Sequence, residues 1–274
     1  MILSLDEIKA FQTSILEHYY EHNRSMPWRE SFDPYEILVS EFMLQQTQVS
    51  RVLPKYLEWL EKFPRLENLA QAPLAEVLIA WSGLGYNRRA KFLWETARII
   101  HFEKNGIFPH SAAELEKLPG IGHYTARAVL CFSKKSPEVF IETNIRSVYI
   151  FYFFKEKSLV KDSELFPLIE KTLYKENPKI WYYALMDYGA TLKKKIKNPS
   201  RKSAHHTKQA PFKGSFREVR GIILKELTQE AAESLDLRQL QEKHKIEYQL
   251  LYDAAEKLCS EGLVLKEDDV YVLG

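Results

Sequence analysis

The sequence predicts a mainly α-helical protein that ends in a small α+β module. Apolar residues recur at helical spacing through most of residues 1–192, and strand patterns are nearly absent there. Turn residues divide this pattern into segments of ordinary helix length. Near the end of the chain, two short runs rich in β-branched residues flank Lys266–Asp269, a pattern typical of a β-hairpin.

The length of 274 residues is enough for one large domain or two modest ones, each with a buried core. Net charge is only +2, but its distribution is uneven. Residues 193–220 hold ten Lys or Arg and one acid, whereas residues 221–274 hold six basic and twelve acidic residues. Such a basic segment is typical of a stretch that contacts phosphates, and a solvated linker is the alternative.

The chain has two cysteines, Cys131 and Cys259, which can build neither a disulfide framework nor a cysteine-based metal site. Its first residues lack the basic and apolar regions of a secretory signal. No stretch approaches eighteen apolar residues without charge. We therefore expect a cytoplasmic protein in a reducing compartment, without a membrane span and without a metal site.

Helical spacing predicts about ten helices in the first 192 residues, and Pro34 occupies the first position favoured by proline. The predicted helical segments are 5–22, 35–44, 49–63, 66–72, 74–81, 88–103, 113–118, 125–133, 145–154, 165–174 and 181–192.

The segment from Lys193 to Gly214 is basic and has no apolar period, so we expect an extended linker or a loop that follows DNA. Helices are predicted after it over 217–227, 237–243 and 247–262, with Gly262 as a C-cap, followed by the hairpin. This order resembles a winged helix, which binds DNA or proteins. The acidity of this part favours a packing or protein-facing role.

The chain is organised around Leu118–Ala126, where Gly120 and Gly122 follow a proline between two apolar-periodic stretches. We expect a helix, a tight hairpin and a second helix. Both glycines can take positive φ and carry no Cβ, so the backbone can approach another surface closely. Amides at the start of the second helix would then bind an anion such as a DNA phosphate. An ordinary helix–helix turn is the alternative.

Glu41 falls on an otherwise apolar helix face, between Leu38 and Leu44. A buried carboxylate is costly, and desolvation would raise its pKa toward that of a general acid. Glu142 ends an apolar run and precedes Asn144, which we interpret as an N-cap. Two such carboxylates across a cleft can cleave a glycosidic bond, one protonating the leaving group and the other stabilising the sugar cation. Ordinary salt bridging or capping is the alternative.

Loop and helix-end positions also carry side chains that can wedge into a base stack. These residues are Gln45, Gln46, Tyr86, Met26 and Trp28.

Several motifs together closely resemble the adenine-specific mismatch DNA glycosylases, the MutY family, over roughly residues 1–192. They are Met26–Arg29, Asp33–Tyr35, Ser40–Val49, Trp81–Ala90, the hairpin described above and Met186–Ala190. The resemblance implies a helix-hairpin-helix glycosylase domain at 1–192, with two helical subdomains flanking the active cleft. A basic linker at 193–214 and a winged-helix-like domain at 215–274 complete the expected organisation. The implied partner is duplex DNA with a mismatch or lesion, bound by a monomer.

The resemblance also implies roles for individual residues. Glu41 corresponds to the general acid that protonates adenine, and Glu142 to the carboxylate that stabilises the sugar cation. Tyr124 lies near the sugar, and Asn144 lies beside the acid. The remaining roles are insertion into the duplex by Gln46 and Tyr86, DNA contact by Gly120, Gly122, Arg29, Met26, Gln45 and Thr47, and a base pocket at Trp28 and Asp187.

Relatives that also cut the strand place a lysine at the position of Tyr124, so the resemblance implies hydrolysis without lyase chemistry. Three departures from the family are visible. The family's four-cysteine iron–sulfur cluster is expected to be absent, because Lys193 stands where its first cysteine belongs. Glu142 replaces an aspartate, and the C-terminal part differs from the family's usual 8-oxoguanine-recognising domain. No cofactor is expected, apart from a monovalent cation at the hairpin.

Three functions remain open at this point. The first is a monofunctional glycosylase that removes adenine opposite guanine or 8-oxoguanine. The second is the same scaffold acting on thymine or uracil opposite guanine. The third is a non-catalytic DNA-binding protein.

Overall fold

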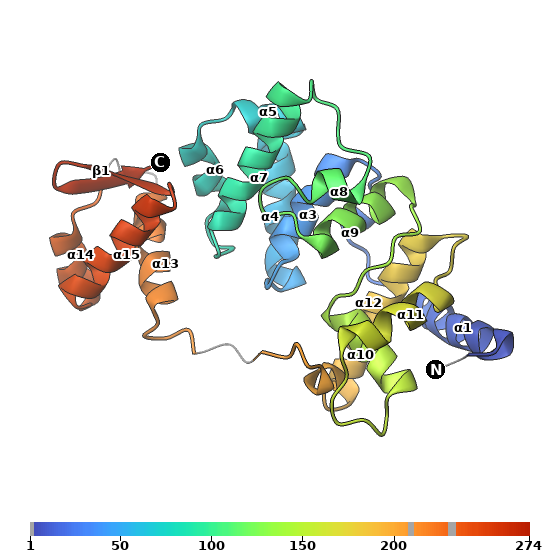
Figure 1. Ribbon diagram of the computed structural model, residues 1–274. Helices are drawn as coiled ribbons and strands as arrows, with labels where there is room; N and C mark the ends of the chain where they lie inside the picture. The colour runs from blue at the N-terminus through green and yellow to red at the C-terminus, as the bar shows by residue number, and fades with distance from the viewer. Residues whose placement is uncertain (1–2, 208–210, 230–233) are drawn as a thin grey trace. The chain divides into compact units, whose positions relative to one another are not determined.

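The computed structural model describes residues 3–207, 211–229 and 234–274 (Figure 1). The chain folds into two compact units. The first unit comprises Met1–Leu38, His110–Lys117 and Ile121–Lys208, and the second comprises Val39–Pro109, Leu118–Gly120 and Gln209–Gly274. The mainly helical fold with a small C-terminal sheet is confirmed.

The first unit is built from helices around an aromatic core. Phe11 makes edge contacts with Tyr149 and Trp181, and the rings of Phe140 and Tyr182 are stacked at 3.8 Å between centroids. Its elements are α1 (Leu5–His22), α2 (Pro27–Glu30), the start of α3 (Pro34–Leu44), α8 (Ala112–Leu115), α9 (His123–Lys134), α10 (Thr143–Phe153), α11 (Asp162–Thr172), α12 (Pro178–Lys195) and the 3-10 helix η2 (Pro199–Lys202).

Helices α10 and α12 lie against each other, and Gly189 makes this possible (Figure 1). A Cβ at Gly189 would collide with the carbonyl group of Asn144. Because Gly189 has no side chain, the backbone of α12 can lie close to the first turn of α10. This contact matters for the site because Glu142 and Asn144 lie at that end of α10.

The second unit combines the end of α3 with the central helices and the C-terminal residues. Trp59 and Trp81 meet edge to face at its core, with ring centroids 5.5 Å apart. Its helices are α4 (Val49–Lys62), α5 (Leu66–Gln71), α6 (Leu74–Trp81), α7 (Arg88–Arg98), the π-helical turn η1 (Ile99–Glu103), α13 (Phe216–Leu227), α14 (Leu237–His244) and α15 (Tyr248–Ser260).

The chain ends in the expected antiparallel hairpin of β1 (Val264–Glu267) and β2 (Val270–Leu273). Asp268 adopts a φ of 53° in its turn, and Gly262 ends α15 with a φ of +63°. A single antiparallel bridge between Leu235 and Tyr271 adds a third short strand contact. We call residues 211–274 the C-terminal module.

The prediction of an extended chain from Lys193 onward is wrong for residues 193–203. Helix α12 continues to Lys195, and η2 packs against α10. Val160 then forms a parallel bridge with Ser203, and the Ser147 hydroxyl donates to Asn198 Oδ1 at 3.1 Å. Backbone pairing and caps thus fix a segment whose composition gave no apolar period. Within the part of the chain that the structure describes, no helix is long and apolar enough to cross a membrane.

Candidate functional site

Glu41 lies in α3, in the part that belongs to the second unit. Its side chain is only 5% exposed, and its neighbours on the same helix, Leu38 and Phe42, are fully buried. The burial expected from the apolar pattern is therefore confirmed. A carboxyl group buried on an apolar helix face is a candidate for proton transfer.

Two loops of the second unit present exposed side chains from a strained backbone. Gln46, just after α3, has a φ of 55° and is exposed. Tyr86, just before α7, has a φ of 48° and is 41% exposed, and it follows Gly83 and Gly85, which also take positive φ. Positive φ is costly for residues other than glycine and persists where the surroundings enforce it. These are the two residues that the sequence resemblance assigns to insertion.

The buried side chain of Arg89 fixes the backbone of both loops. It is 7% exposed and lies at the start of α7. Its guanidinium group donates, at 2.6–3.4 Å, to the carbonyl oxygens of Phe42, Met43, Gln45, Leu84, Gly85 and Tyr86 and to the hydroxyl of Thr47.

The Arg89 side chain is also in contact with aromatic rings. Its guanidinium carbon lies 5.2 Å from the ring centroid of Trp81 and 5.5 Å from that of Tyr86. Burial lowers the pKa of Arg89 to about 10, which still leaves it charged at neutral pH. Sequence reasoning missed this residue, because an arginine beside a second arginine, Arg88, looks like a solvated helix face.

Thr47 and Gln45 therefore serve the loop itself. The Thr47 hydroxyl both accepts from Arg89 and donates to the Gln45 carbonyl oxygen at 3.2 Å. These contacts support the loop backbone on which Gln46 stands. Direct contact of Gln45 or Thr47 with DNA stays a prediction.

The two hairpin glycines differ in what they require. Gly120 has a φ of +71°, and a Cβ there would lie 2.7 Å from Phe92 Cβ and 2.9 Å from Phe42 Cε1. Gly122 has an ordinary extended φ of −96°, and a Cβ there would meet no atom within 4 Å. Of the two glycines that can take positive φ, Gly120 thus does so and Gly122 does not. Gly122 is instead the N-cap of α9 and is exposed, at a helix end whose first amides have no partner within the helix.

In the first unit, Glu142 is the N-cap of α10, so the assignment of that cap to Asn144 is wrong. The Glu142 carboxylate accepts from the backbone amides of Asn144 and Ile145, at 2.7 and 2.8 Å. The residue-type preference for Asn at N-caps misled the sequence interpretation. Here the acidic residue two positions earlier caps the helix through the amides of Asn144 and Ile145.

Burial raises the pKa of Glu142, although the two amides and the charge of Lys193 act in the opposite direction. The Lys193 ammonium donates to Asn144 Oδ1 at 2.8 Å, and the Asn144 amide donates to Glu142 Oε2 at 3.3 Å. Asn144 thus links the basic end of α12 to the carboxylate. The Tyr124 ring is half-buried and meets Phe140 edge to face, with centroids 5.6 Å apart.

Asp187 is buried at 2% exposure and holds two arginines. Arg29 donates to both of its oxygens at 2.8 Å, and Arg24 donates from Nε at 2.6 Å. Burial would raise the pKa of Asp187, but the hydrogen bonds and charges of Arg29 and Arg24 outweigh it and hold the pKa low. The carboxylate is therefore engaged within the protein.

This ion cluster bears on the roles expected of the residues at the start of α2 and within it. Arg29 is 8% exposed and its guanidinium group donates to Asp187 and the Arg24 carbonyl oxygen, so its contacts in this structure support the fold, and the DNA contact assigned to it stays a prediction. Met26 and Trp28 are also buried, at 5% and 2% exposure. Met26 is thus not presented as a wedge, because an apolar side chain at this helix start packs inward. Trp28 and Asp187 keep a base-pocket role as a prediction.

The residues present do not fit an iron–sulfur cluster held by four thiolates. Lys193 donates to Asn144 where a cysteine ligand would be needed, and Cys131 and Cys259 belong to different units. Among the described residues, no group of three or more His, Cys, Asp or Glu side chains is placed to hold a metal ion. No reaction step is assigned to an iron–sulfur cluster in this chain.

Glu41 belongs to the second unit, whereas Glu142, Tyr124, Asn144 and Asp187 belong to the first. Joint action of the two carboxylates therefore stays a prediction. Within each unit, the structure provides a separate half of the expected chemistry: a buried acid with two exposed loops, and a capped carboxylate beside a tyrosine.

Comparison with known proteins agrees with this arrangement. Adenine DNA glycosylase from Buchnera aphidicola is 38% identical over 192 residues, covering 67% of this chain and 53% of the relative. The Mycobacterium tuberculosis protein of the same name is 45% identical over 137 residues, covering 50% of this chain and 45% of the relative. The chain thus spans about half the length of the curated relatives it matches.

A solved structure described as a thermostable thymine-DNA glycosylase is 26% identical, with a TM-score of 0.62 over 71% of this chain and 91% of that one. The sequence model described as "HhH-GPD superfamily base excision DNA repair protein" matches residues 39–180. These similarities confirm the family resemblance of the sequence motifs. The chain belongs to the HhH-GPD superfamily of base excision DNA repair proteins.

Proposed function

We propose that this chain is a monofunctional DNA N-glycosylase that removes adenine from a mismatch with guanine or 8-oxoguanine. The observation that carries the proposal is the buried Glu41 carboxylate on an apolar helix face, immediately before a loop held by Arg89. The similarity to adenine DNA glycosylases supports adenine as the base.

In the proposed reaction, the target nucleotide is flipped out of the duplex at a cost of a few kcal/mol of unstacking. Glu41 then donates a proton to the extruded adenine, which makes the base a better leaving group. Breaking the C1′–N9 bond leaves positive charge on the deoxyribose. Water adds to C1′ of this sugar and releases a proton, which gives an abasic site.

Glu142 is proposed to stabilise the sugar cation. Its fixed position at the start of α10 supports this role, because two backbone amides orient one oxygen and Asn144 orients the other. Tyr124 carries a phenol where a lyase needs an amine. Strand cleavage through a Schiff base is therefore not expected.

The proposed DNA contacts come from exposed backbone and loop positions. Gln46 and Tyr86 fill the space left by the flipped nucleotide. The amides at the start of α9, next to Gly122, bind a phosphate, and a monovalent cation at the hairpin would assist them. Positive charge in residues 193–220 supports a strong dependence of binding on salt.

The test is a panel of duplexes that each contain one mismatch or lesion, incubated with excess protein. Adenine should be released opposite guanine or 8-oxoguanine, and Glu41→Gln should lower the single-turnover rate by at least about a hundredfold. The glutamine keeps the shape of the side chain, so DNA binding should persist. Strand breaks should appear only after alkali treatment.

A second candidate is excision of thymine or uracil opposite guanine. The similarity to the thymine-DNA glycosylase structure supports it. Release of these bases in place of adenine, again lost in Glu41→Gln, would favour this candidate. Binding of every duplex without release of any base would instead favour a non-catalytic DNA-binding protein.

A further inference from the structure

The loop that carries Tyr86 is fixed on its backbone side. Arg89 binds the carbonyl oxygens of Leu84, Gly85 and Tyr86, and Trp81 Nε1 donates to the Gly85 carbonyl oxygen at 3.1 Å. These contacts leave the side chain of Tyr86 as the adjustable part of the loop. Its ring remains 41% exposed.

The hydroxyl end of that ring is held by the C-terminal module. Arg217, in the first turn of α13, donates from Nη1 to the Tyr86 hydroxyl at 2.9 Å. The two residues are 131 positions apart in sequence, so this contact depends on docking of the module. A hydrogen bond from a charged donor is stronger than one between neutral groups.

Several contacts dock the module beside the Tyr86 loop. The hydroxyls of Ser82 and Thr228 are 3.1 Å apart. Lys91 of α7 donates to the carbonyl oxygen of Glu261 at 2.6 Å and passes over Gly262, where a Cβ would collide with its ammonium group. The absence of a side chain at Gly262 thus permits this contact, besides ending α15.

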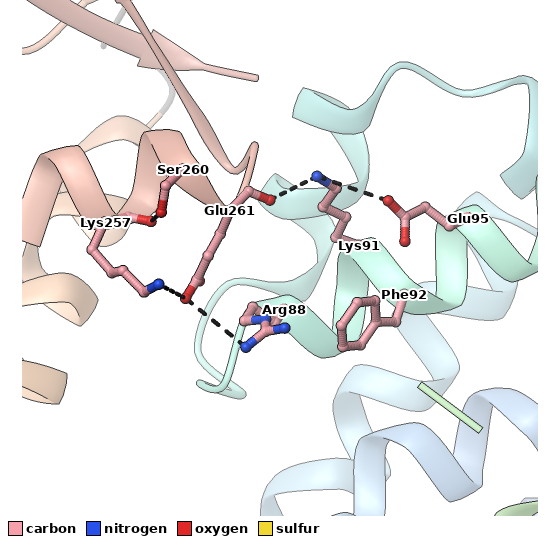
Figure 2. Close-up of a pocket in the computed structure, with 7 residues that line it drawn as sticks. All are labelled: Arg88, Lys91, Phe92, Glu95, Lys257, Ser260 and Glu261. Atoms are coloured by element: carbon pink, nitrogen blue, oxygen red, sulfur yellow. Dashed lines mark hydrogen bonds and ion pairs between the residues drawn. The ribbon is translucent and has the colours of Figure 1, made fainter. Parts of the chain in front are cut away.

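The Glu261 side chain is the centre of an ion cluster at this contact. Figure 2 shows Arg88 of α7 and Lys257 of α15 pointing toward its carboxylate. Arg220 of α13 also pairs with it, and the Glu261 side chain is 8% exposed. Charges from α7, α13 and α15 therefore meet on one shielded carboxylate, which fixes the module more firmly than an exposed ion pair would.

The start of α13 also presents a small surface of aromatic and basic side chains. Phe212 is 59% exposed, and the Arg217 guanidinium carbon lies 6.0 Å from its ring centroid. Lys213 and Phe216 are exposed in the same stretch. Proteins that bind single-stranded nucleic acid use the same combination, with basic groups along the backbone and aromatic rings against bases.

Building on the proposed function, we propose that the start of α13 is part of the DNA interface. Arg217 positions the Tyr86 ring for insertion, and Lys213 and Phe212 contact the backbone of the same duplex. Holding the ring in one orientation before binding lowers the conformational entropy lost on insertion. The acidic composition of the whole module had suggested a protein-facing role. The local charge beside Tyr86 points instead to DNA.

The test compares the full chain with Arg217→Ala, Tyr86→Phe and the double variant. Binding to a duplex with one adenine–8-oxoguanine mismatch is measured by fluorescence anisotropy at several salt concentrations. Arg217→Ala should weaken binding about tenfold and lower the slope of log affinity against log salt by about one. Tyr86→Phe removes only the hydroxyl, so the same change at Arg217 should cost less in that background.

Lys213→Ala provides a second variant that removes an exposed side chain and should also reduce the salt slope. Arg238→Ala, on the exposed surface of α14 in the same module, removes the same charge and should leave binding unchanged. Thermal unfolding of each variant verifies that it is folded.

Unchanged affinity and salt slope in both Arg217→Ala and Lys213→Ala would overturn the proposal. Tighter binding by Arg217→Ala would overturn it as well, since the contact would then hold Tyr86 away from DNA. Base release by the unmodified chain is measured separately. Its absence would count against the proposed function, while the binding comparison would still decide whether α13 touches DNA.

Discussion

Arg29 in the first unit and Arg89 in the second are equally buried, at 8% and 7% exposure, yet their charges are balanced differently. Arg29 faces a carboxylate, with two hydrogen bonds of 2.8 Å to Asp187 and the ring of Tyr183 at 4.6 Å. Arg89 faces backbone carbonyl oxygens and a hydroxyl, all neutral.

The difference shows two uses of a buried guanidinium group. A counter-charge ties two elements together, here helices α2 and α12, and chiefly supports the fold. Carbonyl dipoles let one side chain fix the course of two loops without bringing in another charge. Removing the arginine from the first arrangement leaves a buried carboxylate without its main counter-charge. Removing it from the second leaves only neutral groups, but it frees the two exposed loops.

The largest effect on stability is expected from Arg29→Met. This change leaves the buried Asp187 carboxylate with only the half-exposed Arg24, so the free energy of unfolding should fall by about 3–5 kcal/mol. Urea denaturation measures this. The double variant Arg29→Met, Asp187→Leu should recover most of the loss, because the stranded charge is gone. If the double variant were as unstable as the single one, the counter-charge would not be what Arg29 supplies.

A smaller loss of stability, about 1–3 kcal/mol, is expected from Arg89→Met, because the carbonyl groups that it leaves are neutral, and those of Gln45, Gly85 and Tyr86 are only part-buried and can be hydrated. Its main effect should be on the loops. Hydrogen exchange should speed up at residues 44–48 and 83–86, and affinity for mismatched DNA should fall more than in Arg29→Met. Equal DNA affinity of Arg29→Met and Arg89→Met would contradict the different roles given to the two arginines.

The smallest expected effect on stability is that of Glu142→Gln, which tests a third charged group, the half-buried carboxylate at the start of α10. The glutamine oxygen can still accept from the amides of Asn144 and Ile145, so thermal stability at pH 7 should be kept or raised. The rate of base release should fall at least about a hundredfold.

The pH dependence of this variant follows from the raised pKa of Glu142. The folded protein binds the Glu142 proton at a higher pH than the unfolded chain, whose ordinary value is 4.5. Lowering the pH from 7 toward 5 should therefore stabilise the unmodified protein relative to Glu142→Gln. Thermal unfolding at several pH values would contradict the assignment if the difference stayed constant or moved in favour of Glu142→Gln as the pH fell.

Much of the fold was predictable from local patterns. Helix α1 was expected over 5–22 and α6 over 74–81, and both have these bounds in the structure. Their apolar spacing and terminal residues act over a few positions of the chain, which is the range that sequence patterns describe. The C-terminal hairpin and the glycine that ends α15 were predicted for the same reason.

Errors arose where side chains act across the fold. Asn144 has the residue type of an N-cap, but Glu142, two positions earlier, is the N-cap of α10 and accepts from the Asn144 amide. Arg29 has the residue type of a DNA contact, and its pairing with Asp187, 158 positions away in sequence, could not be predicted. Residue type alone does not tell which partner a polar group meets, because the partner comes from a distant segment.

The sequence by itself determined the helical architecture, the two hairpins, the burial of Glu41 and the family to which the chain belongs. Only the tertiary structure decided that Arg89 holds both exposed loops, that Asp187 is occupied by two arginines, and that Arg217 reaches the hydroxyl of Tyr86. Helices and turns follow from interactions between near neighbours in the chain. Contacts between polar groups far apart in sequence exist only after packing has brought them within hydrogen-bonding distance and excluded the water that would otherwise compete.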